Sequence, residues 1–451
     1  MVLEIITALV LAWLLYFLLS SYASRKSLPP GPFPLPYIGN LHQVGFDIPF
    51  SLEKLREKYG DMYTVTLPIG NFVILNSSKL MREALVSRKD DFSGRTGVSN
   101  FPFNHIFEGK DVGFTDYSPE YTFRRKVFSS AMHIFGEGKR LAKQRLNKST
   151  NELLKLLHET EGRPFSMKDH METTSVNVLC EWLVNTSYKP GDPALKKLKE
   201  FNENFAVLIR PGSAHHFLPF LRFLPTAYKN TLREVLKTRD DYFGSFLEHH
   251  RRTYKSGVVR DLTDAFLAAF EKVQGISEGD GDVIKFLMMN AFFAATDTSS
   301  AIVVWFVLHM VLFENAQKKL HEELDRVIGK DRLPQIEDSE RLHYMQAVIC
   351  EVIRHSHSIA LIMRRAVRDT SLQSYRIPKG TTVIFNLWRI HSNANEWKEP
   401  ELFKPDRFLD VNGEFVGWNS DLDFFPFSLG RRACPGVTLG KMQVRDYGDL
   451  E

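Results

Sequence analysis

The stretch FSLGRRACPG, residues 427–436, sets one cysteine, Cys434, between two glycines and beside an arginine and a proline. Glycines permit backbone angles at which nearby N–H groups point at a sulfur atom. Such donors, together with the charge of Arg432, would stabilise a thiolate. Pro435 and Gly436 fit the start of a helix, whose dipole also favours an anion. Because no second cysteine or histidine stands at zinc-ligand spacing, we interpret Cys434 as the single thiolate ligand of a haem iron, the alternative being a loop with an incidental cysteine.

A second constellation combines one acid with two arginines. In EVIR, Glu351 and Arg354 stand three residues apart on an expected helix with apolar flanks. A solvated pair at this spacing contributes little to stability, whereas buried charges need full pairing. The stretch FKPDRF supplies Arg407 as a third partner.

A third constellation is an acid next to an alcohol inside an apolar run. NAFFAATDTSS, residues 290–300, places Asp297 beside Thr298 within the expected long helix of residues 284–312. Polar groups in such a run carry a desolvation penalty. Dioxygen chemistry gives a reason to keep them, since an acid–alcohol pair relays the protons that O–O cleavage consumes. The alternative is a threonine bonded to its own helix and a buried, neutral aspartate.

The complete spacing F-x-x-G-x-R-x-C-x-G makes the chain resemble the cytochrome P-450s, which are haem-thiolate monooxygenases. The resemblance runs from about residue 28 to residue 444 and is closest to the microsomal branch of steroid 17-hydroxylases and aryl-hydrocarbon hydroxylases. It implies a haem cofactor with Cys434 as axial iron ligand, and Ala295 is a departure because the family usually has glycine there. The cofactor-binding residues that it implies are Tyr121, Arg125, Arg365, Phe427, Arg432, Cys434 and Gly436. Its structural triad is Glu351, Arg354 and Arg407.

The haem-propionate contacts of the family map onto SPEYTFRRKVF, residues 118–128. Arg125 matches the family's arginine, and Tyr121 replaces its tryptophan with a hydroxyl that can also donate a hydrogen bond. The resemblance makes Arg124 and Lys126 candidate contacts of an acidic reductase. Arg365 fits a further propionate partner, with a register that is open by one residue.

The implied reaction inserts one atom of dioxygen into an apolar small molecule, steroid-like or polycyclic and xenobiotic. Electrons would come from NADPH through NADPH-cytochrome P-450 reductase, with cytochrome b5 as a further candidate partner, because the chain has no dinucleotide fingerprint of its own. The alternatives are a haem-thiolate isomerase, which the acid–alcohol pair argues against, and a non-catalytic haem- or lipid-binding membrane protein. The expected substrate-pocket residues are Phe101, Phe103, Phe107, Asn290, Ala291, Ala294, Ile359 and Ala360.

The elements that must position these residues are mainly helical. Short β-rich runs at 62–75 and 375–387 predict small sheets, and most of the sequence between them has helical character. We therefore expect one mainly α haem domain, residues 37–451, of cytochrome P-450 fold. Its net charge of +4 over 451 residues gives no reason to expect a nucleic-acid partner.

A membrane anchor and a stiff linker should precede this domain. Residues 1–24 hold an uncharged apolar run, and Arg25 and Lys26 follow it. We expect a retained single-pass anchor in the endoplasmic reticulum membrane with the haem domain in the cytosol, rather than a cleaved signal peptide. The basic and proline-rich linker, residues 25–36, should hold the domain close to the membrane lipid. The resemblance also implies a longer C-terminal segment than the 17 residues that follow Cys434, so the domain is expected to be incomplete at that end.

Overall fold

The computed structural model describes residues 2–45, 47–95, 101–137, 139–189, 191–210, 213–274, 280–332, 335–418 and 422–441. The expected end of the chain, residues 442–451, lies outside these residues. The longer helices are α1 (Val2–Arg25), α2 (Ile48–Tyr59), α5 (Pro119–Glu137), α6 (Lys139–His158), α7 (Met167–Val184), α8 (Pro193–Ile209), α10 (Ala227–Thr238), α11 (Ser245–Thr253), α12 (Leu262–Gln274), α13 (Asp280–Leu312), α14 (Glu314–Val327) and α15 (His343–Ser356). Short helices are α3 (Ser78–Arg82), α4 (Phe103–Phe107), α9 (Ala214–Phe217) and α16 (Leu387–Ile390). The prediction of a mainly α fold with small sheets is confirmed.

Two small sheets complete the architecture. One has the order β1-β2-β6-β3, formed by β1 (Met62–Leu67), β2 (Gly70–Leu75), β6 (Thr382–Asn386) and β3 (Leu361–Arg365). The other pairs β4 (Thr370–Leu372) with β5 (Tyr375–Ile377). The predicted hairpin at 62–75 is present as the antiparallel pair β1–β2. Because β2 runs parallel to β6, more than 300 residues of chain separate two neighbouring strands, so the sheet joins the two ends of the fold.

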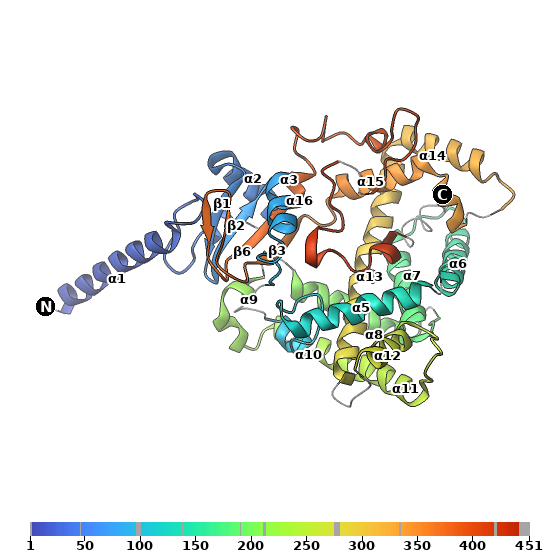
Figure 1. Ribbon diagram of the computed structural model, residues 1–451, viewed down its shortest axis with the longest axis horizontal. Helices are drawn as coiled ribbons and strands as arrows, with labels where there is room; N and C mark the ends of the chain where they lie inside the picture. The colour runs from blue at the N-terminus through green and yellow to red at the C-terminus, as the bar shows by residue number, and fades with distance from the viewer. Residues whose placement is uncertain are drawn as a thin grey trace.

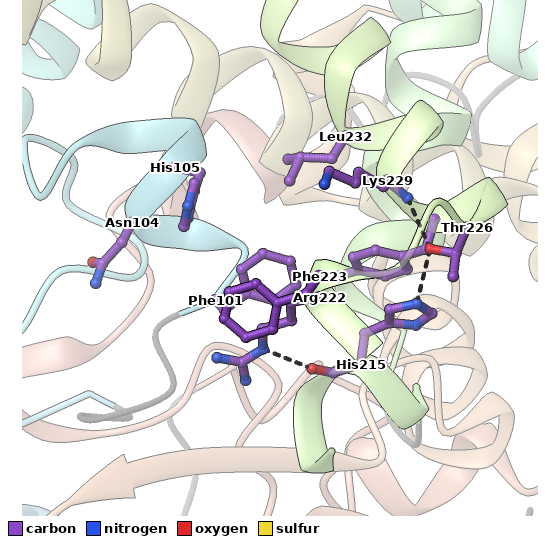
Figure 2. Close-up of a pocket in the computed structure, with 10 residues that line it drawn as sticks. Phe101, Asn104, His105, His215, Arg222, Phe223, Thr226, Lys229 and Leu232 are labelled. Carbon is purple, nitrogen blue, oxygen red and sulfur yellow. Dashed lines mark hydrogen bonds between the residues drawn. The ribbon is translucent and has the colours of Figure 1, made fainter. Parts of the chain in front are cut away.

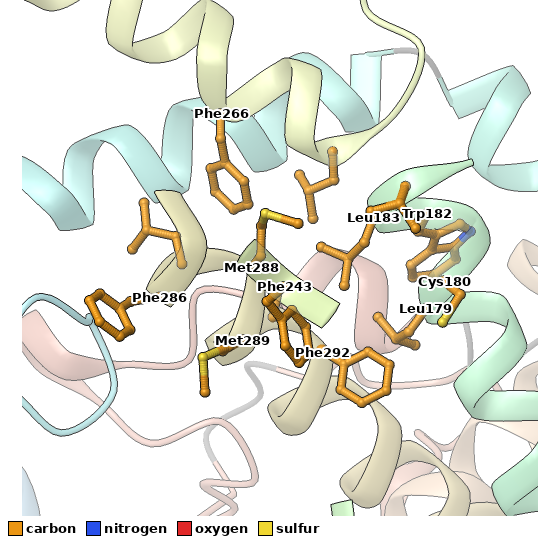
Figure 3. Close-up of a cluster of buried hydrophobic side chains, with 14 of the residues drawn as sticks. Leu179, Cys180, Trp182, Leu183, Phe243, Phe266, Phe286, Met288, Met289 and Phe292 are labelled. Atoms are coloured by element: carbon orange, nitrogen blue, oxygen red, sulfur yellow. The ribbon is translucent and has the colours of Figure 1, made fainter. Parts of the chain in front are cut away.

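The core forms around α13. This helix of 33 residues is apolar on most of its surface, which is typical of a helix that is surrounded by other helices. Figure 3 shows Met288 and Phe292 of α13 packed with Phe266 of α12, Phe243 and the α7 side chain Trp182. Burial of each large apolar side chain stabilises the fold by about 1.5–3 kcal/mol. In Figure 1 the red C-terminal segment returns to the middle of the molecule, between α15 and α5 and beside α13.

The N-terminal helix α1 projects from the body (Figure 1). Its span from Glu4 to Arg25 is apolar, unburied and long enough to cross a membrane. Helix α13 is likewise long and apolar enough, but many of its side chains pack in the core. The linker after α1 is attached to β1: Arg25 donates from Nη2 to the Thr64 carbonyl at 3.4 Å, and the Thr64 N–H donates to the Pro30 carbonyl at 2.8 Å. A Cβ at Gly31 would lie 1.9 Å from the Thr64 oxygen, so only glycine permits this approach.

Candidate active site

The loop that carries Cys434 begins with the short 3-10 turn η7 (Gly430–Arg432). Gly430 has φ +73° and approaches the backbone of Leu85 so closely that a Cβ would lie 2.0 Å from the Leu85 carbonyl oxygen. Both facts require glycine there. The Cys434 N–H donates to the Phe427 carbonyl at 2.9 Å, which closes the loop beneath the sulfur. The Cys434 side chain itself is exposed.

The electrostatics of the sulfur differ in part from the expectation. The protein atoms packed around the thiol raise the pKa of Cys434, while the Gly436 N–H and the charge of Arg125 oppose that rise. Arg432 serves a different purpose, since its Nε donates to the Ser93 carbonyl and its Nη2 to the Thr115 carbonyl, both at 2.8 Å. Ligation to a metal would remove the thiol proton outright.

Four arginines converge beside this loop, and we call them the arginine cluster: Arg95, Arg125, Arg364 and Arg432. Burial lowers the pKa of Arg95 to about 10, and the charge of Arg432 contributes. Burial also lowers the pKa of Arg364, with the charges of Arg95 and Arg432 acting in the same direction. Such mutual repulsion in a buried site indicates that an anion belongs among the guanidinium groups.

The polar atoms of the arginine cluster support a haem site. Within the described ranges, the Tyr121 hydroxyl and the Nε atoms of Arg95 and Arg364 are buried and have no hydrogen-bond partner. The ring of Tyr121 lies 3.5 Å from the Arg432 guanidinium carbon. Buried donors without acceptors are rare and costly. Haem carries two propionate carboxylates, which would supply both the missing acceptors and the missing negative charge, so the residues present fit the implied cofactor.

The two neighbouring arginines of β3 have different roles. Arg364 is buried and donates to the Arg432 carbonyl and to the Ser428 hydroxyl, each at 3.1 Å. Arg365, which the resemblance suggested as a propionate partner, instead pairs with Asp116 at 3.3 Å. Successive side chains of a strand point to opposite faces, so a shift of one residue exchanges the two environments. The geometry therefore favours Arg364 as the propionate partner.

Helix α5 presents its charges on two sides. Arg125 donates from Nη2 to the Ala433 carbonyl at 2.5 Å, next to Cys434. Arg124 was expected to face a reductase, and this expectation is wrong because its side chain is buried and donates to the carbonyls of Glu120 and Gly109. Lys126 is exposed, as a partner contact requires.

The acid with two arginines comes together as the sequence suggested. Glu351 and Arg354 are both fully buried, and Arg354 donates two bonds to the carboxylate, from Nε at 2.7 Å and from Nη2 at 2.8 Å. The Arg407 Nε lies 3.2 Å from the same carboxylate, and the Lys404 N–H donates to it at 2.8 Å. Arg354 also donates to the His391 carbonyl, so the pair is fully bonded inside the protein.

The acid–alcohol pair is present on α13, but its two members point in different directions. The Thr298 hydroxyl donates to the Ala294 carbonyl at 2.6 Å. This is the bond expected in the alternative interpretation, in which the threonine bonds to its own helix. Asp297 accepts a bond from the Asn202 amide of α8 at 3.4 Å. Burial, followed by the charge of Glu172, raises the pKa of Asp297. Among the described residues no hydrogen bond joins the Asp297 carboxylate to the Thr298 hydroxyl.

The expected pocket residues lie in different surroundings. Ala294 and Thr298 are exposed on the same side of α13, one turn apart. Phe107 is buried in the core, and Phe103 stacks on Phe114 at 4.0 Å between ring centres.

Asn290 was expected as a polar handle for substrate, but its amide oxygen accepts the backbone N–H groups of Val112 and Gly113 and so holds a loop. Ala291 is buried next to it. Ile359 is 45% exposed and Ala360 is partly exposed, just before β3. Phe101 lines a separate cavity (Figure 2).

Sequence reasoning missed two further polar arrangements. Arg95 carries no local motif, and its convergence with Arg364 follows from long-range packing. His250, Asp261 and Asp264 form a buried group whose ligand atoms lie within 4.8 Å of one another. Arg260 already neutralises Asp264, with Nε at 2.6 Å. The His250 ring faces two acceptors, the Phe246 carbonyl and the Asp261 carboxylate, which is the environment of a charged imidazolium rather than of a metal ligand.

Comparison with known proteins agrees with this site. The chain matches the family model described as Cytochrome P450 over residues 29–445. It is 34% identical to cytochrome P450 2E1 of Oryctolagus cuniculus over 450 residues, which cover 97% of this chain and 90% of that protein. It is 32% identical to steroid 17-alpha-hydroxylase/17,20 lyase of Rana dybowskii over 429 residues, which cover 93% and 82%. The chain that builds this cysteine loop and arginine cluster therefore belongs to the cytochrome P450 family of haem-thiolate monooxygenases.

Proposed function

We propose that this protein inserts one atom of dioxygen into an apolar small molecule of steroid-like or polycyclic type, with electrons that come from NADPH through NADPH-cytochrome P-450 reductase. The observation that carries the proposal is the arginine cluster beside the Cys434 loop, because its unbonded buried donors suit the carboxylates of haem. The substrate class rests on the relatives, one of which is named a steroid 17-alpha-hydroxylase/17,20 lyase.

The cofactor's position would be fixed from two sides. Cys434 would ligate the iron from one face, and Tyr121, Arg125, Arg364 and Arg432 would hold the propionates at the edge. Bound in this way, haem would supply the iron at which electrons from the reductase reduce dioxygen, and electron donation from the thiolate would assist O–O cleavage. Arg125 would act twice, because it also bonds the Ala433 carbonyl next to the sulfur.

Protons would reach the site from helix α13. Because its pKa is raised, the Asp297 carboxylate is a stronger base than an ordinary aspartate, so it can take up a proton and pass it on. The Thr298 hydroxyl is exposed and could hand on a proton once its bond to the Ala294 carbonyl opens. Since the two side chains do not bond to each other, a water molecule would have to pass the proton from Asp297 to Thr298.

The substrate would lie against the small side chain of Ala294, which leaves room for a flat and rigid apolar molecule. We also propose that α1 anchors the protein in the endoplasmic reticulum membrane as a single span, with the haem domain in the cytosol. The basic residues after α1 support this orientation. The bonds that join Arg25 and Pro30 to Thr64 of β1 support a domain held close to the bilayer.

Two measurements test the proposal. Cys434→His should abolish the thiolate-type Soret shift of the reduced carbon monoxide complex, because that shift requires electron donation from sulfur. Turnover of steroids and polycyclic aromatics with reductase and NADPH should give hydroxylated products from the wild type. An unchanged Soret shift in Cys434→His refutes the ligand assignment, and product without reductase refutes the monooxygenase cycle.

A further inference from the structure

The buried histidine His391 connects the structural triad to the segment that leads into the cysteine loop. It directly follows α16, and its side chain is enclosed by the rings of Trp397 and Phe424, with ring centres at 6.5 and 5.4 Å. Its carbonyl accepts a bond from Nη1 of Arg354, a cation of the triad, at 2.8 Å. Its ring Nε2 accepts the N–H of Phe425 at 3.1 Å. One residue therefore bonds to both segments, which lie far apart in the sequence.

The bond to Phe425 is the first in a series that reaches the cysteine. The Phe425 carbonyl accepts the Ser428 N–H at 3.1 Å, and the Phe427 carbonyl accepts the Cys434 N–H at 2.9 Å. Ser428 has φ +60°, an angle that side chains rarely adopt and that persists only where the surrounding structure determines it. The ring of His391 thus fixes the residue from which the hydrogen bonds of the loop begin.

The geometry also assigns the protonation state of His391. A backbone N–H can only donate, so Nε2 must be unprotonated and the ring proton lies on Nδ1. An imidazolium has no acceptor and could not make this bond. Burial, followed by the neighbouring His357 and Arg354, lowers the pKa of His391 to about 3. The ring therefore remains a neutral acceptor at neutral pH.

We propose that His391 is a positioning residue for Cys434: its neutral ring holds the Phe425 N–H and thereby keeps the cysteine loop in the conformation that ligates the haem iron. This role rests on the proposed function, in which Cys434 is the iron ligand. Without the acceptor at Nε2 the buried Phe425 N–H would lose its partner, and buried N–H groups without partners are rare and costly. The start of the loop would move to regain a partner, and the iron–sulfur bond would be held less firmly.

The test compares the haem-loaded wild type with His391→Phe, His391→Gln and the control His309→Phe. Phenylalanine keeps a ring of similar size without an acceptor, whereas the amide oxygen of glutamine can take the place of Nε2. His309 is a matched control because it is also a buried histidine, 3% exposed. Its ring bonds to the Trp305 carbonyl and to the His355 ring, which do not belong to the cysteine loop.

The measured quantity is the rate at which the reduced carbon monoxide complex loses its thiolate-type Soret band. It is followed at a temperature at which far-ultraviolet circular dichroism shows every variant to be folded. Loss of one buried hydrogen bond should make the rate in His391→Phe about tenfold faster than in the wild type. His391→Gln should stay within about twofold of the wild type, because the acceptor is restored. His309→Phe should keep the wild-type rate although its urea midpoint falls.

Equal rates in His391→Phe and His309→Phe would overturn the proposal, and so would a rate in His391→Gln as fast as in His391→Phe. If His391→Phe does not retain haem, the decision passes to His391→Gln and His391→Asn, since the shorter asparagine cannot reach the position of Nε2. Slower loss in His391→Gln supports the role of His391, and equal rates refute it. A wild type without the thiolate-type band would refute the proposed ligand Cys434 and this role together, whereas equal rates with that band present refute the role of His391 alone.

Discussion

Replacement of Glu351 by glutamine should be among the most damaging single changes in this protein. The carboxylate accepts two bonds from Arg354, one from Arg407 and one from the Lys404 N–H, and every neighbour is a donor. The amide nitrogen of glutamine would place a donor against donors, and Arg354 would keep an unpaired charge with no exposure to solvent. Removal of one partner from a buried ion pair costs about 3–5 kcal/mol. That is a large share of a total stability of about 5–15 kcal/mol.

The matched control is Glu248→Gln, which removes the same group from an exposed pair. Glu248 and Arg252 lie 2.8 Å apart with side chains 53% and 76% exposed, so the loss should be about 0.3–0.5 kcal/mol. Arg407→Gln is the intermediate case, because it leaves the Glu351–Arg354 pair intact but removes the contact to Glu351 at 3.2 Å and the Arg407 bonds to the carbonyls of Lys398, Glu399 and Leu402. We expect it to cost about 1–3 kcal/mol.

The assay is urea unfolding of the three haem-loaded variants and the wild type, followed by far-ultraviolet circular dichroism and by Soret absorbance. The expected order of destabilisation is Glu351→Gln, then Arg407→Gln, then Glu248→Gln. If Glu351→Gln folds and costs no more than Glu248→Gln, the buried triad contributes no more than a surface pair and the reasoning is wrong. If Glu351→Gln does not fold, the comparison of Arg407→Gln with Glu248→Gln still decides, and equal costs refute it.

Three further predictions follow from the site. Arg364→Met should release haem to apomyoglobin several-fold faster than Arg365→Met, since only Arg364 faces the unbonded donors of the arginine cluster. Equal release rates in the two variants would refute Arg364 as the propionate partner. Thr298→Ala should leave haem binding unchanged while less product forms per NADPH, and Asp297→Asn should slow turnover; unchanged coupling in Thr298→Ala would contradict the proton route. Burial lowers the pKa of His250, but its hydrogen bond to a buried aspartate outweighs this, so the pKa is raised above 6.5. The stability that its charge contributes should be complete below pH 6.5 and lost as the pH rises through the raised value, and the thermal midpoint of His250→Gln should lack this dependence.

The sequence alone determined those features that depend on neighbours along the chain. The spacing of glycine, arginine and Cys434 specifies the loop, because Gly430 must adopt a backbone angle that side chains resist. The separation of Glu351 and Arg354 by three residues puts them on one face of any helix. The two long apolar runs likewise indicated α1 and the long core helix, and the helical character of most of the sequence indicated the mainly α class.

Tertiary structure decided which side chains meet across long separations. Arg364 reaches the cysteine loop and Arg365 does not, because the register in which β3 pairs with β6 decides which of these two neighbouring side chains faces the loop. Asn290 holds a loop instead of facing substrate, since the segment at Val112 packs against α13. The cavity that Phe101 lines exists only because α4, α9 and α10 converge there. No local pattern encodes such contacts: burial and pairing depend on the packing of segments that lie far apart in the sequence, whereas a motif reports only the conformations that its own residues permit.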